Sequence, residues 1–414
     1  MHLARKTRYS NRLMKTFAIH TLGCKVNQYE SRQIDQWLRG HHLTAAPQGG
    51  RADLVIINTC CVTQSASAKS RQSIRKAQKK NPHATVIVTG CLPAGPAEES
   101  AALSGNIILV SQKDRLLDTL HSVLLKNNSQ NPLSGSKPAS LDKIKCKNDP
   151  EIQDICGPDR FGPLHSYSDQ TRAFLKIQDG CDAYCTYCII SKIRNQLWSK
   201  PLDIVLEEAR SLVAAGHPEI VLTGIFLGAW GRNTARRKRW DPHQPSRLPH
   251  LLRQLAQIPG LMRLRLSSLE PPDVTDEIVK VYQEYPNIAP HLHLPLQSGS
   301  PRILKRMARQ YTAEEYLKIC GNLQVALDRP AITTDIIVGF PGETEEDFEK
   351  TVEICRRVNF AKIHVFPYSP RRGTPATRLD CPVRPAIIRQ RTAILHQLDS
   401  RLQEKFRRQF IGEK

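Results

Sequence analysis

Three cysteines in the middle of the chain have the type and spacing of iron ligands. Cys181, Cys185 and Cys188 follow a glycine in a C-x3-C-x2-C arrangement. Three thiolates can hold three irons of a cubane [4Fe–4S] cluster and leave the fourth iron open to a small chelating molecule. A zinc site is the alternative, but it requires a fourth Cys or His close by, and no His stands within the loop. The spacing therefore predicts an iron–sulfur site with one open position.

A second set of three cysteines follows three predicted strands. The apolar runs 16–22, 54–57 and 85–89 are each followed closely by a cysteine, namely Cys24, Cys60 and Cys91. Helix-like stretches at 28–40 and 65–80 lie between these runs, which indicates a parallel α/β sheet. Ligands of open α/β sheets gather at the carboxyl ends of the strands. The sequence therefore predicts a second site for three irons.

The remaining composition favours a polyanionic partner and a reducing compartment. The chain has 60 Lys and Arg against 39 Asp and Glu, a net charge of +21, and phosphates attract such a surplus. A basic protein that is merely soluble is the alternative. Twelve cysteines with uneven spacing in a long chain do not fit a secreted disulfide framework. Six of them are interpreted as buried or idle thiols: Cys61, Cys146, Cys156, Cys320, Cys355 and Cys381.

The second half of the chain repeats a strand–helix pattern. The predicted strands are 173–178, 219–224, 263–268, 291–296, 333–339 and 362–368, with helical patterns such as 203–215 and 345–357 between them. Six such units predict an open, partial (β/α)6 barrel, whose active residues lie at the C-terminal ends of the strands. The loop of Cys181 follows the first strand. A basic loop at 231–240 is expected on the same face, either touching phosphate or as a solvated charge run.

The fold class is therefore α/β, with a parallel-sheet domain over 15–125 and a barrel over 169–398. Residues 126–168 are rich in Asn, Ser, Lys and Pro and predict a flexible linker. The basic N-terminal stretch lacks an apolar core, which fits a transit peptide, a disordered leader, or a start at Met14 rather than Met1. No apolar run is long enough to span a bilayer, so no membrane is expected.

The motifs, taken in order, resemble the radical-SAM tRNA methylthiotransferases, which use S-adenosylmethionine (SAM). The resemblance covers nearly the whole chain and rests on residues 21–31, 58–63, 90–91, 181–188, 264–271, 291–300, 307–311, 335–344 and 366–375. Residues 23–31 resemble the branch acting on N6-threonylcarbamoyladenosine. The branches for isopentenyladenosine and for a ribosomal protein usually differ there.

The resemblance implies two [4Fe–4S] clusters with different tasks. The cluster at Cys181, Cys185 and Cys188 would pass an electron to SAM, which splits to methionine and a radical that removes hydrogen from adenine. The cluster at Cys24, Cys60 and Cys91 would supply sulfur, and a second SAM the methyl group. The implied product is 2-methylthio-N6-threonylcarbamoyladenosine next to the anticodon. Another tRNA adenosine, a ribosomal protein as substrate, and a non-catalytic RNA-binding relic are the alternatives.

Polar residues at strand ends are candidate SAM contacts, and no catalytic residue is assigned beyond the clusters. The candidates are Tyr187, Ser267, Ser268, Glu270, Gln297, Gly339, Pro341 and Gly342. The glycines of the 339–342 turn allow close backbone approach. Strand-end polar groups also cap helices or satisfy the backbone, which is the alternative. His291 and His293 share a strand face and either line the barrel mouth or are satisfied core residues.

The resemblance also implies partners, and two departures from the family bear on them. We expect tRNA, SAM, an electron donor such as flavodoxin or ferredoxin, a monomer, and a cytoplasmic location. After Cys188 the family's usual proline and glycine are replaced by Ser191 and Asn195, which bears on substrate entry. Residues 399–414 look like the remnant of a TRAM domain, the family's C-terminal RNA-binding β-barrel, so we expect that barrel to be absent or truncated.

Overall fold

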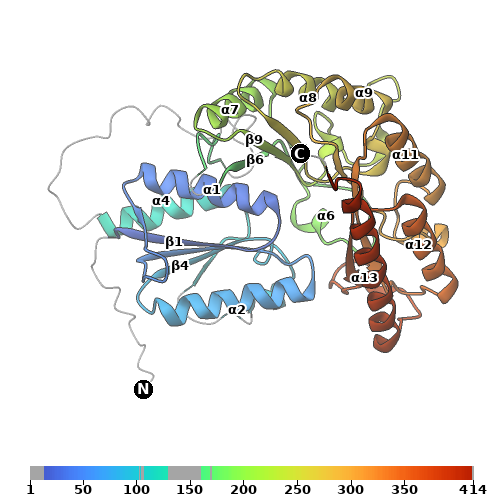
Figure 1. The fold of residues 1–414 in the computed structure, drawn as a ribbon. Coiled ribbons are helices and arrows are strands. Elements are labelled where there is room, and N and C mark those ends of the chain that lie inside the picture. Colours follow the sequence, from blue (N-terminus) through green and yellow to red (C-terminus); the bar gives the residue numbers. More distant parts are fainter. Residues whose placement is uncertain (1–13, 102, 104–106, 129–159, 168–169, 413–414) are drawn as a thin grey trace. The chain divides into compact units, whose positions relative to one another are not determined.

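The computed structural model describes residues 14–101, 103, 107–128, 160–167 and 170–412 (Figure 1). The chain forms two compact units: an N-terminal unit of residues 1–61 and 65–162, and a C-terminal unit of residues 62–64 and 163–414. Most of the predicted linker, and the N-terminal stretch before Met14, lie outside the described residues. Within the described residues, no helix is both long and apolar enough to cross a membrane.

The N-terminal unit is a parallel sheet with helices on both faces. Its strand order is β2-β1-β3-β4-β5, and the strands are β1 (Thr16–Thr21), β2 (Thr44–Ala45), β3 (Leu54–Thr59), β4 (Thr85–Gly90) and β5 (Ile107–Leu109). Helices α1 (Lys25–Gly40) and α4 (Asp114–Asn128) cover one face, and α2 (Gln64–Lys80) covers the other (Figure 1). A short α3 (Ala97–Ala101) follows β4. The predicted parallel α/β domain is confirmed.

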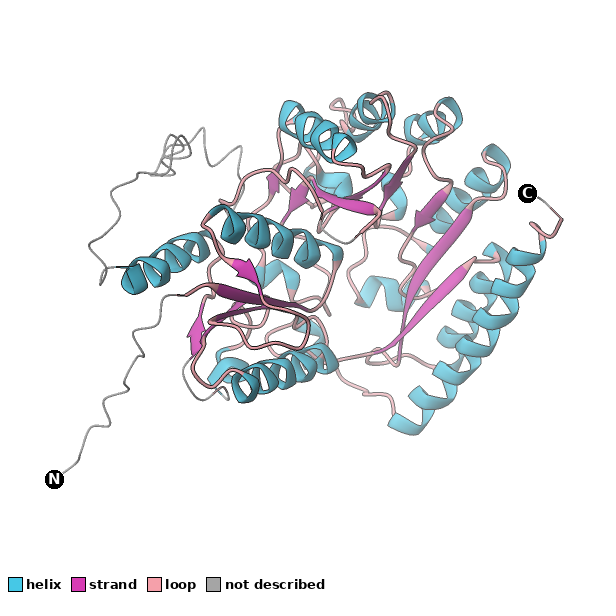
Figure 2. Cartoon of the chain, turned by 60° about the vertical axis from the view of Figure 1, so that its left-hand side comes forward, coloured by secondary structure: helices cyan, strands magenta, loops and turns pink. Residues whose placement is uncertain are grey.

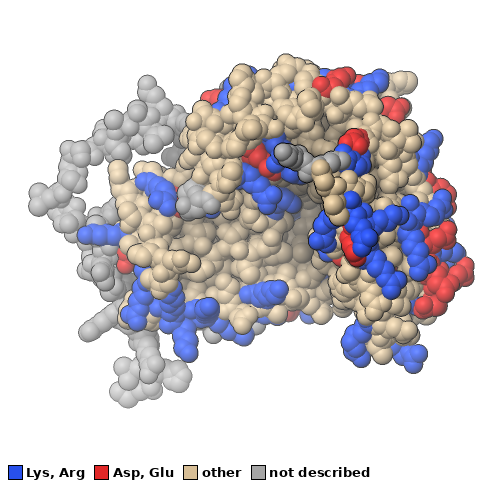
Figure 3. All heavy atoms as spheres, in the orientation of Figure 1, with Lys and Arg blue, Asp and Glu red and all other residues tan. Residues whose placement is uncertain are grey.

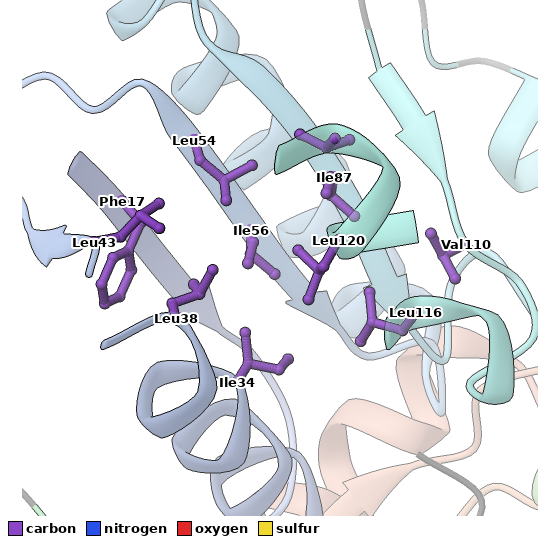
Figure 4. Packing of buried hydrophobic residues seen from close by; sticks show 11 residues of the cluster. Phe17, Ile34, Leu38, Leu43, Leu54, Ile56, Ile87, Val110, Leu116 and Leu120 are labelled. Carbon is purple, nitrogen blue, oxygen red and sulfur yellow. The ribbon is translucent and has the colours of Figure 1, made fainter. Parts of the chain in front are cut away.

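A core lies between the sheet and helices α1 and α4. Leu54 and Ile56 of β3 are fully buried and pack with Ile34 of α1 and Leu120 of α4 (Figure 4). Val55 and Ile57 of the same strand are also fully buried, as expected of a central strand in a parallel sheet that helices cover on both faces. The register pairs Thr21 with Asn58 and Thr59 with Gly90, so the three cysteine-bearing strand ends are aligned.

The C-terminal unit contains two three-stranded parallel sheets that join into one open barrel wall. The sheets are β6-β9-β10 and β11-β12-β13, and parallel bridges from Leu264 to Ile288 and from Ser268 to His293 connect them. The strands are β6 (Arg172–Lys176), β9 (Glu219–Thr223), β10 (Arg263–Leu266), β11 (His291–His293), β12 (Ala331–Val338) and β13 (Lys362–Pro367). The predicted partial (β/α)6 barrel is confirmed.

Helices cover one side of this wall (Figure 2). They are α7 (Leu202–Ala214), α8 (Leu248–Ala256), α9 (Asp276–Glu284), α10 (Pro301–Arg306), α11 (Ala313–Ala326), α12 (Glu345–Val358) and α13 (Pro385–Arg408). The short helix α6 (Ile190–Ile193) lies apart from this row and follows Cys188 along the chain (Figure 1). A small antiparallel pair, β7 (Gln178–Asp179) and β8 (Trp198–Ser199), follows β6. Residues 399–408, interpreted from the sequence as the start of a further domain, continue α13, where Asp399 accepts a hydrogen bond from the Ile363 N–H of β13 at 2.7 Å.

Candidate active site

The second cysteine set lies at the carboxyl ends of three neighbouring strands of the N-terminal unit. Cys24, Cys60 and Cys91 follow β1, β3 and β4, which are adjacent in the sheet. Cys60 and Cys91 are buried, whereas Cys24 is exposed. The backbone N–H of Cys91 donates to the Thr59 carbonyl at 3.0 Å, which brings the ends of β3 and β4 together.

Glycine and asparagine hold these strand ends close. Gly23 has φ +102°, and a Cβ there would lie 2.8 Å from the Cβ of Cys60, so only glycine lets the two cysteine segments approach. The buried side chain of Asn27 donates to the carbonyls of Leu22 at 2.8 Å and Thr59 at 2.9 Å. The bonds join the β1 and β3 ends, and so place Cys24 near Cys60.

The surroundings of this set suit a negatively charged group. Cys24 caps the N-terminus of α1, where the backbone N–H groups and the helix dipole favour thiolates. Neither α1 nor α2 carries an acidic residue in its first turn. A three-thiolate iron–sulfur cluster is anionic, so the donor set and its environment fit it.

The first cysteine set depends on a glycine that no other residue can replace without moving the chain. Gly180 has φ +79°, and a Cβ there would lie 1.8 Å from the Gln196 carbonyl oxygen. The Cys181 N–H donates to the Arg194 carbonyl at 2.9 Å. Arg194 in turn pairs through its guanidinium with Asp179 at 2.9 Å, and both side chains are buried. This packing fixes the start of the cysteine loop after β7.

The three cysteines of the first set share one site, because Cys181 interacts electrostatically with both Cys185 and Cys188. Thiolates are soft ligands, so three of them in one place suit an iron–sulfur cluster.

Burial keeps the first set protonated without a metal. Burial raises the pKa of Cys181 to about 12 and that of Cys188 to about 12, and it also raises the pKa of Cys185. Buried thiols of this kind become thiolates when iron replaces their protons.

Arg309 is a residue of the site that sequence reasoning missed. Its guanidinium donates to the Cys185 Sγ at 3.2 Å and to the Tyr187 hydroxyl at 3.2 Å, and it pairs with Glu270. Its side chain is only 5% exposed. The residue stands in the family-like stretch 307–311, which was the signal available in the sequence. In the structure, Arg309 links the segment after β10, through Glu270, to the cysteine loop, through Cys185.

The candidate SAM contacts at strand ends occupy different environments. The Ser267 hydroxyl is buried without a hydrogen-bond partner in the described structure, which fits a position awaiting a ligand. Glu270 is already paired with Arg309, so its carboxylate is oriented before any ligand arrives. Gln297 has φ +63°, and its backbone bridges to β12. Ser268 bridges to β11 through its backbone.

The residues of the 339–342 turn also pack against other parts of the C-terminal unit, besides any role in binding SAM. Gly339 has φ +77°, and a Cβ there would lie 2.4 Å from Ile388 of α13. Phe340 packs edge-on against Tyr187, with ring centroids 6.5 Å apart, which joins the turn to the cysteine loop. Pro341 and Gly342 accept hydrogen bonds through their carbonyls from Arg306 at 3.3 Å and Arg302 at 2.6 Å. The structure therefore connects Tyr187, Glu270 and this turn.

Comparisons with known proteins agree with this arrangement. The family model described as "Radical SAM superfamily" matches residues 175–355, and the model described as "Uncharacterized protein family UPF0004" matches residues 16–111. The chain is 36% identical to the threonylcarbamoyladenosine tRNA methylthiotransferase MtaB of Thermotoga maritima, over 97% of this chain and 85% of the relative. It is 37% identical to MtaB of Bacillus subtilis, over 97% and 84%. A tRNA-2-methylthio-N(6)-dimethylallyladenosine synthase of Mycobacteroides abscessus is 34% identical, over 91% and 72%.

A solved structure shows the same fold at low sequence identity. The radical SAM methyltransferase TsrM from Kitasatospora setae aligns with a TM-score of 0.55 and 12% identity, over 87% of this chain and 77% of that chain. The barrel and the three-cysteine loop thus define a radical-SAM enzyme. The chain belongs to the radical-SAM tRNA methylthiotransferase family, whose cofactors are SAM and [4Fe–4S] clusters.

Proposed function

We propose that this enzyme methylthiolates C2 of N6-threonylcarbamoyladenosine beside the anticodon of tRNA, giving 2-methylthio-N6-threonylcarbamoyladenosine. The observation that carries the proposal is the pair of three-cysteine sites, one at the carboxyl ends of three adjacent parallel strands of the N-terminal unit and one in the loop after β6 and β7 of the C-terminal unit. The relatives named MtaB support this substrate over other adenosines.

We assign the six cysteines to the two clusters by unit. Cys181, Cys185 and Cys188 hold the cluster with the open iron, and the other three, Cys24, Cys60 and Cys91, hold the auxiliary cluster. When bound, these groups with SAM supply radical hydrogen abstraction, a sulfur atom and a methyl group. The protein's own residues position them: Arg309 donates to Cys185, and Asn27 clamps the strand ends behind Cys24.

The protein shapes the SAM site from the top of the barrel. Tyr187 and Phe340 form an apolar wall, while Glu270, Ser267 and Gln297 offer polar groups at strand ends. Glu270 would hold the positive amino group of SAM's methionine part, because a carboxylate accepts hydrogen bonds from an ammonium. The glycines of the 339–342 turn let the backbone approach the ligand.

A pre-ordered basic loop near the cysteine loop suits the tRNA backbone. Asp182 holds the loop by accepting hydrogen bonds from Thr234 Oγ1 at 2.7 Å and the Ala235 N–H at 2.7 Å. Arg236 stacks over exposed Tyr184 at 3.9 Å. Lys238 and Arg239 of the same loop are exposed. Cations beside an aromatic ring match the phosphates and bases of RNA.

The other partners follow from the reaction. Reducing the cluster requires a one-electron donor, and a flavodoxin or ferredoxin is proposed for it. Since the substrate is tRNA, the enzyme is placed in the cytoplasm. It is proposed to act as a monomer, because each of its two sites is formed within one unit of one chain.

Mass spectrometry of tRNA nucleosides from a deletion strain tests the substrate. The strain should lose 2-methylthio-N6-threonylcarbamoyladenosine and keep its precursor, and plasmid expression of the gene should restore the product. Loss of the 2-methylthio dimethylallyl nucleoside instead would assign the chain to the other activity named among its relatives.

Iron analysis and one variant test the cluster assignment. Anaerobic reconstitution should give about eight irons per chain, from two four-iron cubanes. Cys185→Ala should lower this to about four and abolish SAM cleavage. The buried Cys320 of α11 gives a matched control, since Cys320→Ala should change neither. Near-zero iron in the wild type would favour an RNA-binding relic, and SAM cleavage by Cys185→Ala would overturn the assignment.

A further inference from the structure

Three side chains without a role in the proposed function meet within the C-terminal unit. His293, Asp335 and His364 come from β11, β12 and β13, which are neighbours in one parallel sheet. One nitrogen from each histidine and one carboxylate oxygen all lie within 4.8 Å of one another. Among the residues that the structure describes, no other group of His, Cys, Asp and Glu meets as closely.

Strand register explains why the three meet. Asp335 pairs with His364 across β12 and β13, and His293 pairs with Thr333, two residues before Asp335 on the same face. The intervening Thr334 faces the other way, because its hydroxyl accepts a hydrogen bond from Tyr316 of α11 at 3.4 Å. The cluster therefore lies on the face of the sheet opposite to α11, which is the inner face of the barrel wall.

The side chains are oriented as metal ligands usually are. The Nδ1 of His293 contacts Thr333 Oγ1 at 2.9 Å, and its Nε2 lies 3.3 Å from Asp335 Oδ1. A hydrogen bond at one imidazole nitrogen fixes the ring so that the other nitrogen faces the ion. The His293 and His364 rings have centroids 5.7 Å apart.

The cluster is open to an ion from solution. The side chain of Asp335 is 30% exposed and that of His293 17% exposed, while His364 is an exposed residue. Ligands bonded at about 2.1 Å to a tetrahedral ion lie roughly 3.4 Å apart, so small side-chain rotations close the gap. Two imidazoles and one carboxylate form a set that binds first-row transition metals and leaves positions open.

We propose that His293, Asp335 and His364 bind one divalent transition-metal ion. The proposed site uses none of the residues of either cysteine set. It requires neither SAM nor tRNA, so it stands or falls independently of the proposed function.

Zinc alone is the probe, added to anaerobically reconstituted holoenzyme so that iron already occupies the cysteines. Calorimetric titration should give one zinc per chain beyond the cluster iron. Zinc K-edge X-ray absorption should show nitrogen and oxygen neighbours only. Absence of a stoichiometric site, or sulfur among the zinc neighbours, would overturn the proposal.

Variants locate the site. His364→Ala and Asp335→Asn should each weaken zinc binding at least 30-fold, and Thr333→Val, which removes the partner of Nδ1, should weaken it about tenfold. His396→Ala, at an exposed histidine of α13, is the matched control and should bind as the wild type does. An unchanged iron content shows that each variant is folded. Wild-type zinc affinity in both His364→Ala and Asp335→Asn would refute the assignment.

Discussion

At the scale of single residues, the site depends on side chains that hold the cysteines rather than on the cysteines alone. Arg309 is buried and makes contacts to Cys185, Tyr187 and Glu270 at once. A guanidinium presents five N–H donors in a rigid planar fork, whereas an ammonium has three donors that rotate about a flexible stem. Hydrogen bonds to a ligating sulfur also tune an iron–sulfur centre. Arg309 is therefore a positioning residue.

Arg309→Lys should leave the iron content unchanged and slow SAM cleavage by about 10- to 100-fold, since losing a charge-assisted hydrogen bond costs about 1.5–3 kcal/mol. Electron paramagnetic resonance of the reduced cluster should show shifted g values, because the variant lacks the hydrogen bond to Cys185. Lys280→Arg, at an exposed lysine of α9, is the control. An unchanged spectrum together with an unchanged rate would show that Arg309 does not act on the cluster.

Gly180→Ala should disrupt the cysteine loop. The new Cβ would lie 1.8 Å from the Gln196 carbonyl and impose a strained φ, so we expect about 3 kcal/mol or more of lost stability and a fall from about eight to about four irons. Gly216 is a matched glycine with φ +90° and nothing within 4 Å of a Cβ. Gly216→Ala should cost only about 1–2 kcal/mol and keep the iron. Urea unfolding and iron analysis measure both, and equal losses would contradict the argument.

At the scale of elements, polar contacts at the start of one helix hold two helices of the C-terminal unit together. Thr344 and Asp347 form a capping box at the start of α12. The Asp347 carboxylate also accepts from Ser300 Oγ at 2.6 Å and pairs with Arg302, so α10 and α12 are fastened together. Helix α10 begins in the 299–301 segment and α12 follows the 339–344 segment, and these segments contain or adjoin the candidate SAM contacts Gln297, Gly339 and Gly342. The position of α10 relative to α12 therefore helps to hold the candidate SAM site in shape.

Because Asp347 makes these contacts as a carboxylate, the free energy of unfolding should depend on pH in the acid range. Burial by itself would raise the pKa of Asp347, but hydrogen bonds from Arg302, Ser300 and Thr344 outweigh it and hold the pKa well below its ordinary value. A carboxylate with a lowered native pKa stabilises the fold above its unfolded pKa of about 3.9, and this contribution disappears as pH falls toward the native value. The free energy of unfolding should therefore drop between about pH 5 and pH 2.

Asp347→Asn should cost about 1–3 kcal/mol at pH 7 and flatten this acid dependence. Glu346→Gln is the control, because the neighbouring Glu346 is exposed and its ion pair with Lys350 on the same helix is worth about 0.3–0.5 kcal/mol. Urea unfolding of both variants at pH 7 and pH 3 gives the comparison. The same acid slope in Asp347→Asn and the wild type would rule out this carboxylate as the source.

At the scale of the whole molecule, the Lys and Arg side chains behind the net charge of +21 are unevenly distributed over the surface. Figure 3 shows Lys and Arg side chains along α2 and along α13. Helix α2 has six cations and no acidic residue, with Ile74 and Ala77 facing the core and Lys69, Arg75, Lys76 and Lys79 exposed. An unbalanced cationic helix face attracts phosphates and binds them in a salt-dependent way. We expect α2 to contribute to tRNA affinity.

The double variant Arg75→Glu with Lys79→Glu should weaken tRNA binding about tenfold or more at low salt. It should also make the dependence of log K on log salt shallower, by about 0.7–0.9 for each phosphate that the protein no longer neutralises. Lys280→Glu reverses a charge on α9 and should have a much smaller effect. Filter binding over a salt series measures the slopes. Equal slopes for the α2 variant and the wild type would remove α2 from the interface.

The sequence by itself predicted the six cysteines that we propose as cluster ligands and the strands that precede them, because both signals are local. A C-x3-C-x2-C spacing is read within eight residues, and a buried strand such as Leu54–Thr59 is indicated by its own apolar run. The tertiary structure alone decided which distant side chains meet. Arg309 contacts a cysteine 124 positions earlier, and the turn at Gly339 requires glycine because Ile388 of α13 packs against it. His293, Asp335 and His364 converge only through strand register. No local sequence pattern indicates such contacts, because they arise from the packing of elements that are distant in the sequence.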